Sequence, residues 1–393
     1  MAGGTAEKSN STLEAAIALA PRIRAAAEEI EQGRRIPPHL VQAMKEAGIF
    51  RMAMPRAWGG PELDPIMQLR VIEAIARADG SAGWCAMINS DGGYFSAFFD
   101  QDAAREMYRD LDAPSASSLV FSGRAVAADG GYRVTGRWPF VSGCQHCDWV
   151  LLTCEVYEGD APRIGSNGMP ERRACLIGSG EFEVLDTWYS TGLRGSGSHD
   201  VAVRNVLVPA ERACKFPLES RRAGTLYAYP MMFVYNVPAV TLGIARGAID
   251  TFVEIAERKP VTMSMLTGRK RMLRDEAYVQ SAAGRAEALV SSARHFVYGQ
   301  MEELWQTLLE GKRLSLRQRA LYRLAITHAH AACAEAVEML YKAYGGSSVY
   351  SSGPFDRYLR DVLTANQHTV NSLKIYEAAG RVLLGLDLEE PIF

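Results

Sequence analysis

Apolar residues recur every three to four positions in two parts of the chain, before about residue 110 and after about residue 225. That spacing places apolar side chains along one face of an α-helix. It predicts helices with prolines at their starts at residues 11–35 and 37–50, and longer helices at residues 237–258, 277–310, 315–344 and 354–385. The longer helices indicate a bundle, with breaks at Gly268, at Gly311 and at the turn of Gly345 and Gly346.

Between about residues 115 and 212, apolar and polar residues alternate instead. Alternation is typical of a β-strand with one buried face. It predicts strands at residues 131–143, 148–157, 173–179, 182–190 and 200–209, separated by Gly, Ser and Asp. We therefore expect an α-helical domain at residues 1–114, an antiparallel β domain at residues 115–215 and a four-helix bundle at residues 216–393.

The composition narrows the class of partner. Of the 393 residues, 48% are hydrophobic and 22% are charged, and the formal net charge is -2. Such a chain can bury a large core, and without a long Lys/Arg run it offers no surface suited to nucleic acid. No apolar run approaches the roughly 18 residues of a membrane helix, and the first residues lack a secretion signal. We expect a cytoplasmic protein with a small-molecule partner, and neither nucleic acid nor membrane.

Cys144 and Cys147 form a C-x-x-C motif with His146 between them. The seven cysteines are an odd number in a chain without a secretion signal, so reduced thiols are expected. A zinc site needs four ligands, and no second C-x-x-C or matched histidine pair is present. A thioredoxin-type motif opens a helix, whereas this one lies between two predicted strands. We expect structural thiols and no metal site.

Three motifs together resemble a known family: "RADGSAGWCAM" at residues 77–87, "GRWPFVSGCQHCDWV" at 136–150 and "WYSTGLRGSGSHDVAVRNVLVP" at 188–209. They are most similar to the oxygenase components of two-component flavin-dependent monooxygenases, especially those that hydroxylate a 3-hydroxy-seco-steroid or a phenol. The resemblance implies the acyl-CoA dehydrogenase fold, mainly α with a middle antiparallel β-barrel and a C-terminal four-helix bundle. It also implies a homotetramer and a flavin held between the β domain and the bundle.

Within this fold, the residues favour an oxygenase over a dehydrogenase. An acyl-CoA dehydrogenase needs a carboxylate base, which commonly stands nine residues after the Arg of an Arg-Asp pair. Here the pair is Arg360-Asp361, and the position holds Thr369, while Glu377 comes too late. The Arg-x-x-Phe-Gly stretch common in dehydrogenases is also missing from residues 258–272. A dehydrogenase or oxidase whose base lies on another helix remains an alternative.

His368 precedes Thr369 and matches a histidine of the steroid-type and phenol-type oxygenases. With an ordinary pKa near ~6.5, a histidine can take a proton from a phenol or an indole N–H at neutral pH. The resemblance therefore makes His368 the expected catalytic and substrate-binding residue; the alternative is a structural histidine hydrogen-bonded within the bundle. Tyr94 is a second candidate for the substrate pocket, or else a core residue.

By the resemblance, small hydroxyls and aromatic walls surround the flavin ring, and Ser142 is also a catalytic candidate. The expected flavin contacts are Trp84, Ser117, Ser118, Phe140, Ser142, Trp188, Arg194, Ser196, Ser198, Arg269, Gly345 and Gly346. Two alternatives stay open. The glycine-rich stretch that contains Arg194 can be a plain hairpin turn. The basic cluster around Arg269, proposed as a phosphate clamp, can be a solvated loop.

The resemblance implies hydroxylation of an aromatic substrate, such as a phenol, an indole or a fused ring, by O2 and reduced flavin through a C4a-hydroperoxyflavin. Residues 195–200 lack the third glycine of a dinucleotide-binding fingerprint and precede a predicted strand. A separate NAD(P)H-dependent flavin reductase is therefore expected to supply FMNH2 or FADH2 by diffusion. An N-hydroxylating oxygenase of the same fold and a binding protein that has lost the flavin remain alternatives.

Overall fold

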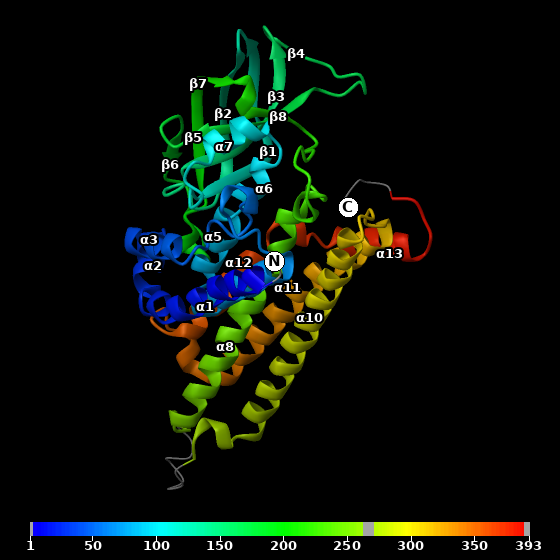
Figure 1. The fold of residues 1–393 in the computed structure, drawn as a ribbon. Coiled ribbons are helices and arrows are strands. Elements are labelled where there is room, and N and C mark those ends of the chain that lie inside the picture. The colour runs from blue at the N-terminus through cyan, green and yellow to red at the C-terminus, as the bar shows by residue number, and fades with distance from the viewer. Residues whose placement is uncertain (1–2, 262–270, 389–393) are drawn as a thin grey trace. The chain divides into compact units, whose positions relative to one another are not determined.

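The computed structural model describes residues 3–261 and 271–388, and the chain divides into two compact units. The sheet unit comprises Met1–Val71, Trp84–Tyr189 and Arg194–Val234, and the helical unit comprises Ile72–Gly83, Ser190–Leu193 and Tyr235–Phe393. Helices α4 (Pro65–Ala78) and α5 (Gly80–Asn89) carry the chain from the sheet unit to the helical unit and back. Figure 1 shows the elements of both units.

Short helices precede the sheet, as the three-to-four spacing predicts. They are α1 (Gly3–Ala25), α2 (Ala27–Gly33), α3 (Pro38–Glu46), α6 (Gly92–Ser96) and α7 (Gln101–Met107). The helix predicted at residues 11–35 is divided at Ala26, and α2 ends at Gly33; the next residue, Arg34, has a left-handed φ of 49°. The side chain of Asp100 accepts hydrogen bonds from the first backbone N–H groups of α7, which are otherwise without partners at a helix start.

The sheet follows the path β6-β7-β2-β1-β3-β5-β8, with β4 paired to β3. Its strands are β1 (Ser115–Ala128), β2 (Gly131–Val141), β3 (Trp149–Glu158), β4 (Ala161–Pro162), β5 (Arg172–Gly178), β6 (Glu183–Leu185), β7 (His199–Pro209) and β8 (Ala213–Lys215). The strand β1 was not among the predicted ones, because its sequence is rich in small residues. It pairs in parallel with β3, whereas the other strand pairs are antiparallel. The prediction of a purely antiparallel domain is wrong in this respect.

The core of the sheet unit forms around Trp138 on β2, which is fully buried. Its indole N–H donates to the carbonyl of Thr153 at 2.7 Å. A Cβ atom on Gly123 of the neighbouring strand would lie 1.9 Å from the Trp138 ring, so only glycine fits there. Trp138 is thus a core residue, and it fixes the register of β1 against β2.

The helical unit contains α8 (Pro238–Arg258), α10 (Ala277–Leu309), α11 (Leu316–Tyr344), α12 (Pro354–Ala365) and α13 (Lys374–Leu383). Helix α11 packs against each of the other four, and α8 also contacts α10 and α12 (Figure 1). Residues 232–258 are long and apolar enough to span a membrane by composition alone. However, 89% of the apolar window is buried within the protein, as in the core helix of a globular domain.

The last predicted helix, residues 354–385, is not continuous. It is divided into α12 and α13, with a short 3-10 helix at Thr369–Asn371 between them. His368 takes an extended conformation, with φ of -65° and ψ of 137°, at the start of that short helix. The expectation that His368, Thr369 and Glu377 share one helix is therefore wrong, since Glu377 lies exposed on α13.

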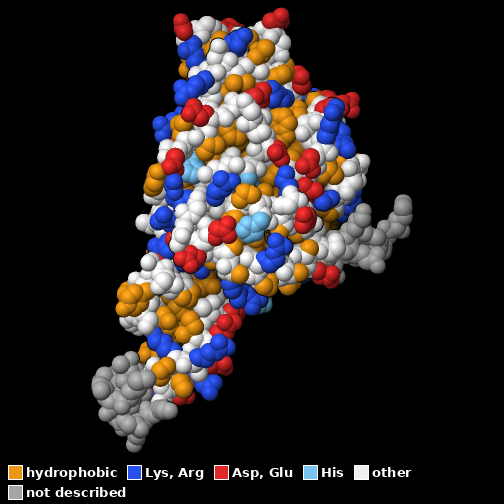
Figure 2. All heavy atoms as spheres, turned by 90° about the vertical axis from the view of Figure 1, so that its left-hand side faces the viewer, with side chains coloured by type: hydrophobic (Ala, Val, Ile, Leu, Met, Phe, Trp, Pro, Cys, Tyr) orange, Lys and Arg blue, Asp and Glu red, His pale blue; other side chains and the backbone are white. Residues whose placement is uncertain are grey.

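The charges are mixed on the face that Figure 2 shows. Lys and Arg side chains lie among Asp and Glu side chains there, and hydrophobic side chains appear between them. This distribution agrees with the small formal net charge of -2. A surface of this kind has no single-signed field of the sort that attracts a polyanion.

Candidate functional site

A buried cluster of hydroxyl groups joins α5, the end of β2 and the start of β7. The indole N–H of Trp84 donates to Oγ of Ser142 at 3.0 Å. Oγ of Ser142 lies 2.8 Å from Oγ of Ser198, which lies 2.7 Å from Oγ of Ser196. All four residues are buried, and Ser142 is only 5% exposed. The structure thus brings four of the predicted flavin contacts into one hydrogen-bonded chain.

Backbone contacts hold this cluster in place. The N–H of Gly143 donates to the carbonyl of Ser196 at 2.8 Å, so the turn after β2 is tied to the approach to β7. The side-chain amide of Asn89 donates to the carbonyl of Ser142 at 3.0 Å. Gly143 has a φ of 73°, and a Cβ atom there would lie 2.3 Å from Asn89, so glycine is required for the close approach. The sequence pattern missed Asn89, because Ser142, whose carbonyl it binds, lies 53 residues away.

The C-x-x-C motif lies beside this cluster and carries no charge. Nε2 of His146 lies 2.9 Å from Oδ1 of Asn89, and burial lowers the pKa of His146 to about 4, with Arg35 and Lys45 adding to the shift. Burial raises the pKa of Cys144 to about 12 and that of Cys147 further above its ordinary value. At neutral pH the imidazole is therefore neutral and both thiols are protonated.

An aromatic pair, one ring exposed and the other half-buried, lies in the same unit. Phe140 on β2 is 66% exposed, and its ring meets that of Trp188 edge to face, with ring centres 6.3 Å apart and planes at 85°. Phe140 has a φ of 60°, which costs a non-glycine residue roughly 1 kcal/mol. An exposed phenylalanine on a strained backbone gains nothing for stability, so it indicates a surface kept for binding. The structure brings this predicted pair together.

The other predicted flavin contacts of the sheet unit take different environments. Ser118 on β1 donates to the carbonyl of Pro139, next to Phe140, at 3.0 Å, and Ser117 beside it is half-buried. Arg194 lies 3.9 Å from the carboxylate of Glu31, so its charge faces α2.

Tyr94 is in the core of the sheet unit. It is 2% exposed, and its hydroxyl donates to the side-chain oxygen of Gln68 at 3.1 Å. Its ring packs against Tyr227 and Phe233, with ring centres 6.4 Å away in each case. Burial raises the pKa of Tyr94 well above its ordinary value, so the phenol stays protonated. The structure favours the alternative that Tyr94 is a core residue.

The helical unit holds the remaining candidates. Gly345 and Gly346 follow α11 in an exposed turn, and Gly345 has a φ of 79°. Arg269 lies outside the described residues, as does the Gly268 break. Nδ1 of His368 accepts a long hydrogen bond of 3.4 Å from the N–H of Val370. Burial, aided by the charge of Arg323, lowers the pKa of His368 to about 4, so the ring is neutral at pH 7.

The Arg360-Asp361 pair has a structural role within the helical unit. Nη1 of Arg360 donates to the carbonyl of Thr191 at 2.6 Å, and the carboxylate of Asp361 accepts from the N–H of Leu193 at 2.6 Å. Gly192 allows this close approach, because a Cβ atom there would lie 2.1 Å from the Arg360 carbonyl. The pair thus anchors residues 190–193, which directly follow the Trp188 segment in the chain.

Comparison with known proteins places the chain among enzymes. Residues 11–108 and 236–373 match the family models described as acyl-CoA dehydrogenase, N-terminal domain, and acyl-CoA dehydrogenase, C-terminal domain. The chain is 30% identical over 366 residues to the indole-3-acetate monooxygenase of Pseudomonas putida, covering 93% of this chain and 91% of that protein. It is 28% identical to the flavin-dependent monooxygenase oxygenase subunit HsaA of Rhodococcus jostii, covering 90% and 93%. The solved structure of Streptomyces XiaF with FADH2 and glycerol is similar, with a TM-score of 0.89 and 25% identity, covering 99% of this chain and 98% of that one.

Proposed function

The chain belongs to the oxygenase components of flavin-dependent monooxygenases, a family with the acyl-CoA dehydrogenase fold, and on this basis we propose that it hydroxylates a small aromatic substrate with O2 and reduced flavin. The predicted fold class and enzyme class are confirmed by these similarities. An aromatic substrate is supported by the relative named for indole-3-acetate, and reduced flavin by the structure that contains FADH2.

The observation that carries the proposal is that one unit holds both the buried hydroxyl cluster and the aromatic pair of Phe140 and Trp188. Ser142, Ser196 and Ser198 supply hydroxyls suited to the polar edge of a flavin ring. Phe140 and Trp188 offer an aromatic surface suited to its face. These residues fit the cofactor, which when bound supplies the activation of O2. The chain's own part is to bind, to orient and to keep water away from the ring.

We propose His368 as the residue that holds the polar group of the substrate. Because Nδ1 already accepts from the N–H of Val370, the neutral ring carries its proton on Nε2 and can donate a hydrogen bond to the oxygen of a phenol. Its pKa of about 4 makes the imidazolium form costly at neutral pH. We therefore expect the Nε2–H of the neutral ring to donate to the substrate oxygen; full transfer of a substrate proton to His368 would be unfavourable.

An oxygenase component acts with a separate reductase, and we propose that this partner is NAD(P)H-dependent and delivers flavin by diffusion. We also propose a homotetramer in the cytoplasm. Assembly is supported by apolar side chains around α13, where Leu373 is 78% exposed and Leu384 is 77% exposed. Sedimentation analysis tests the tetramer, and a monomer at micromolar concentration would contradict it.

Anaerobic titration with FMNH2 and FADH2, followed by rapid mixing with oxygenated buffer, tests the function. We expect tight binding of at least one reduced flavin and a transient absorbance that precedes the spectrum of oxidised flavin. With phenols or indoles present, a hydroxylated product should appear in place of hydrogen peroxide. Oxidised flavin that stays tightly bound and is bleached by an acyl-CoA thioester would instead establish a dehydrogenase.

A further inference from the structure

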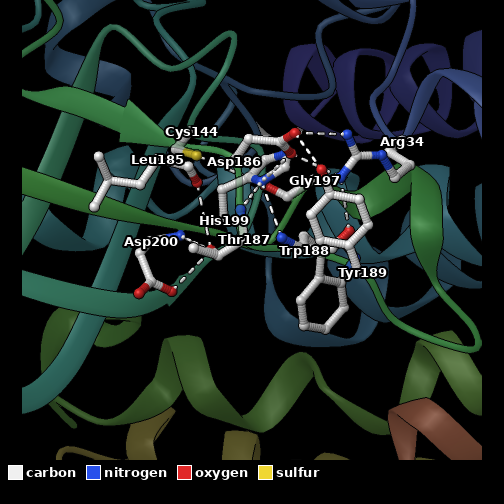
Figure 3. Close-up of polar contacts among 10 residues, drawn as sticks. All are labelled: Arg34, Cys144, Leu185, Asp186, Thr187, Trp188, Tyr189, Gly197, His199 and Asp200. Atoms are coloured by element: carbon white, nitrogen blue, oxygen red, sulfur yellow. Dashed lines mark hydrogen bonds and ion pairs between the residues drawn. The ribbon is translucent and has the colours of Figure 1, made fainter.

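The segment that carries Trp188 is not part of the sheet, although the sequence predicts a strand at residues 182–190. Strand β6 ends at Leu185, which pairs with Asp200, and residues 186–189 then leave the sheet. Two side chains hold these residues instead, Arg34 after α2, which is far away in sequence, and His199 on the neighbouring strand β7 (Figure 3). All of them belong to the sheet unit.

Arg34 contacts residues 186–189 through its guanidinium group. Its two terminal nitrogens bind both carboxylate oxygens of Asp186, at 2.7 Å and 3.0 Å, and one of them also donates to the carbonyl of Trp188 at 3.2 Å. The guanidinium carbon lies 4.2 Å from the ring centre of Tyr189, whose hydroxyl donates to Asp186 at 2.6 Å. The left-handed backbone of Arg34 costs roughly 1 kcal/mol in a non-glycine residue, and these contacts offset it.

His199 holds the same segment by its backbone. Nδ1 of His199 accepts hydrogen bonds from the N–H groups of both Thr187 and Trp188, each at 3.1 Å. A ring nitrogen that accepts hydrogen bonds carries no proton, so the neutral ring has its proton on Nε2. His199 is 1% exposed, which keeps these two bonds away from water. Nearby, the hydroxyl of Thr187 donates to Asp200 at 3.0 Å.

The N–H of Trp188 is thus bound by His199 and its carbonyl by Arg34, so the main chain of Trp188 is fixed on both sides (Figure 3). We propose that Arg34 and His199 are positioning residues that set the Trp188 ring against Phe140, where the flavin ring binds. The inference rests on the proposed function, because Phe140 and Trp188 form its aromatic surface. Neither Arg34 nor His199 is proposed to touch the flavin.

The arrangement implies a response to acid. The groups that act on His199 are Asp186, 3.6 Å from Nδ1, together with Arg34 and Asp200. Burial lowers the pKa of His199, so Nδ1 remains an acceptor at neutral pH. Protonation at low pH would place a proton on Nδ1 and break both bonds to the segment. Affinity for reduced flavin should therefore fall on acidification more steeply in the wild type than in a variant that lacks this ring.

Substitution of Arg34 tests its role in positioning Trp188. Arg34→Ala should weaken binding of reduced flavin by about tenfold and raise the share of O2 released as hydrogen peroxide. The reason is that a displaced Trp188 ring would no longer orient the flavin. Arg34→Lys keeps the charge but loses the two-point contact with Asp186. Its affinity for reduced flavin should lie between those of the wild type and Arg34→Ala. Arg163→Ala is the matched control, since Arg163 pairs with Glu158 at 2.9 Å elsewhere in the sheet unit.

Two substitutions of His199 test its role in positioning Trp188. His199→Asn places an amide oxygen near the position of Nδ1 and should retain flavin binding. His199→Leu removes the acceptor and should weaken flavin binding about as much as Arg34→Ala does. Acrylamide quenching of Trp188, taken as the difference between each protein and its Trp188→Phe form, reports the segment without any flavin. We expect greater quenching in Arg34→Ala and His199→Leu than in the wild type.

Unchanged quenching and unchanged flavin affinity in both variants would overturn the inference. Changed quenching in a protein whose wild type binds no reduced flavin would instead remove the proposed function, while the hold on Trp188 would stand. The quenching measurement therefore separates the two failures. It also distinguishes positioning from general loss of stability, because the Arg163→Ala control breaks a comparable ion pair away from Trp188.

Discussion

The sheet unit and the helical unit carry their candidate residues in opposite ways. In the sheet unit, Trp84, Ser142, Ser196 and Ser198 are buried, bond to one another and include no titratable group. In the helical unit, His368 is a titratable side chain at a break between two helices. Neutral groups that are fixed by packing are thus enough to build a binding geometry. His368 adds a group whose protonation state depends on its burial.

The largest expected effect belongs to His368→Ala. If His368 binds the polar group of the substrate, product formation should fall by about 100-fold, because the substrate would lose a hydrogen bond that orients its ring. Reduced flavin should still bind as in the wild type, because the proposed flavin contacts of the sheet unit are intact. Product yield by chromatography and flavin affinity by titration measure the two. His295→Ala, an exposed histidine of α10, is the control, and equal yields in both variants would refute the role of His368.

Ser142→Val should affect both binding and stability. It leaves the indole N–H of Trp84 and the hydroxyl of Ser198 each short of a partner, which should lower the free energy of unfolding by about 1–3 kcal/mol. Reduced flavin should bind about tenfold more weakly, equivalent to ~1.4 kcal/mol. Denaturant unfolding and anaerobic titration measure these changes. Ser122→Val alters an exposed serine of β1 and should change neither; a Ser142→Val protein with wild-type flavin affinity would contradict the proposed site.

Acid should lower stability through three histidines whose pKa values are lowered in the folded protein. His146, His330 and His368 each have a pKa lowered to about 4, mainly by burial. Between pH 4 and the ordinary value near ~6.5, the unfolded chain binds more protons than the folded one, so stability falls as pH falls through that window. Each unit of pKa shift corresponds to about 1.4 kcal/mol.

Comparison with a His330→Asn variant isolates the effect of one histidine. His330 is buried on α11, with Nδ1 placed 2.9 Å from the carbonyl of Ile326. The wild type should lose more free energy of unfolding than the variant between pH 7 and pH 5, as measured by denaturant titration at each pH. Parallel losses in the two proteins would mean that His330 titrates normally in the folded state.

The smallest expected effect comes from Phe140→Gly. Glycine relieves the left-handed backbone, so the free energy of unfolding should rise by roughly 1 kcal/mol. Flavin affinity should decrease, because an exposed aromatic wall is lost. Asn205→Gly, at a φ of 53°, is the control and should stabilise the protein without changing flavin affinity. If Phe140→Gly left flavin affinity unchanged, the aromatic pair would not be part of the site.

Much of the architecture follows from local pattern. The helices predicted at residues 237–258, 277–310 and 315–344 agree with α8, α10 and α11 to within one residue at each end, because a long apolar stripe specifies a buried helix face. Strand β1 escaped prediction because its small residues give no clear alternation, and its place is set by pairing with β2 and β3. The break before α13 also left no clear signal, since residues 354–385 keep helical spacing throughout.

The candidate site shows the same division between what is local and what is not. Residue types and motif resemblance pointed to the hydroxyls of Ser142 and Ser198 and to the aromatic rings of Phe140 and Trp188. They did not point to Asn89 or Arg34, whose partners are distant in sequence, or to His199, whose partners lie in a segment that leaves the sheet where a strand was predicted. Helical periodicity and the supply of chemical groups can be inferred from local sequence, because both depend on neighbouring residues. Which groups are buried, which pKa values shift and which side chains meet depend on the tertiary structure, because burial and long-range contact arise when distant segments pack together.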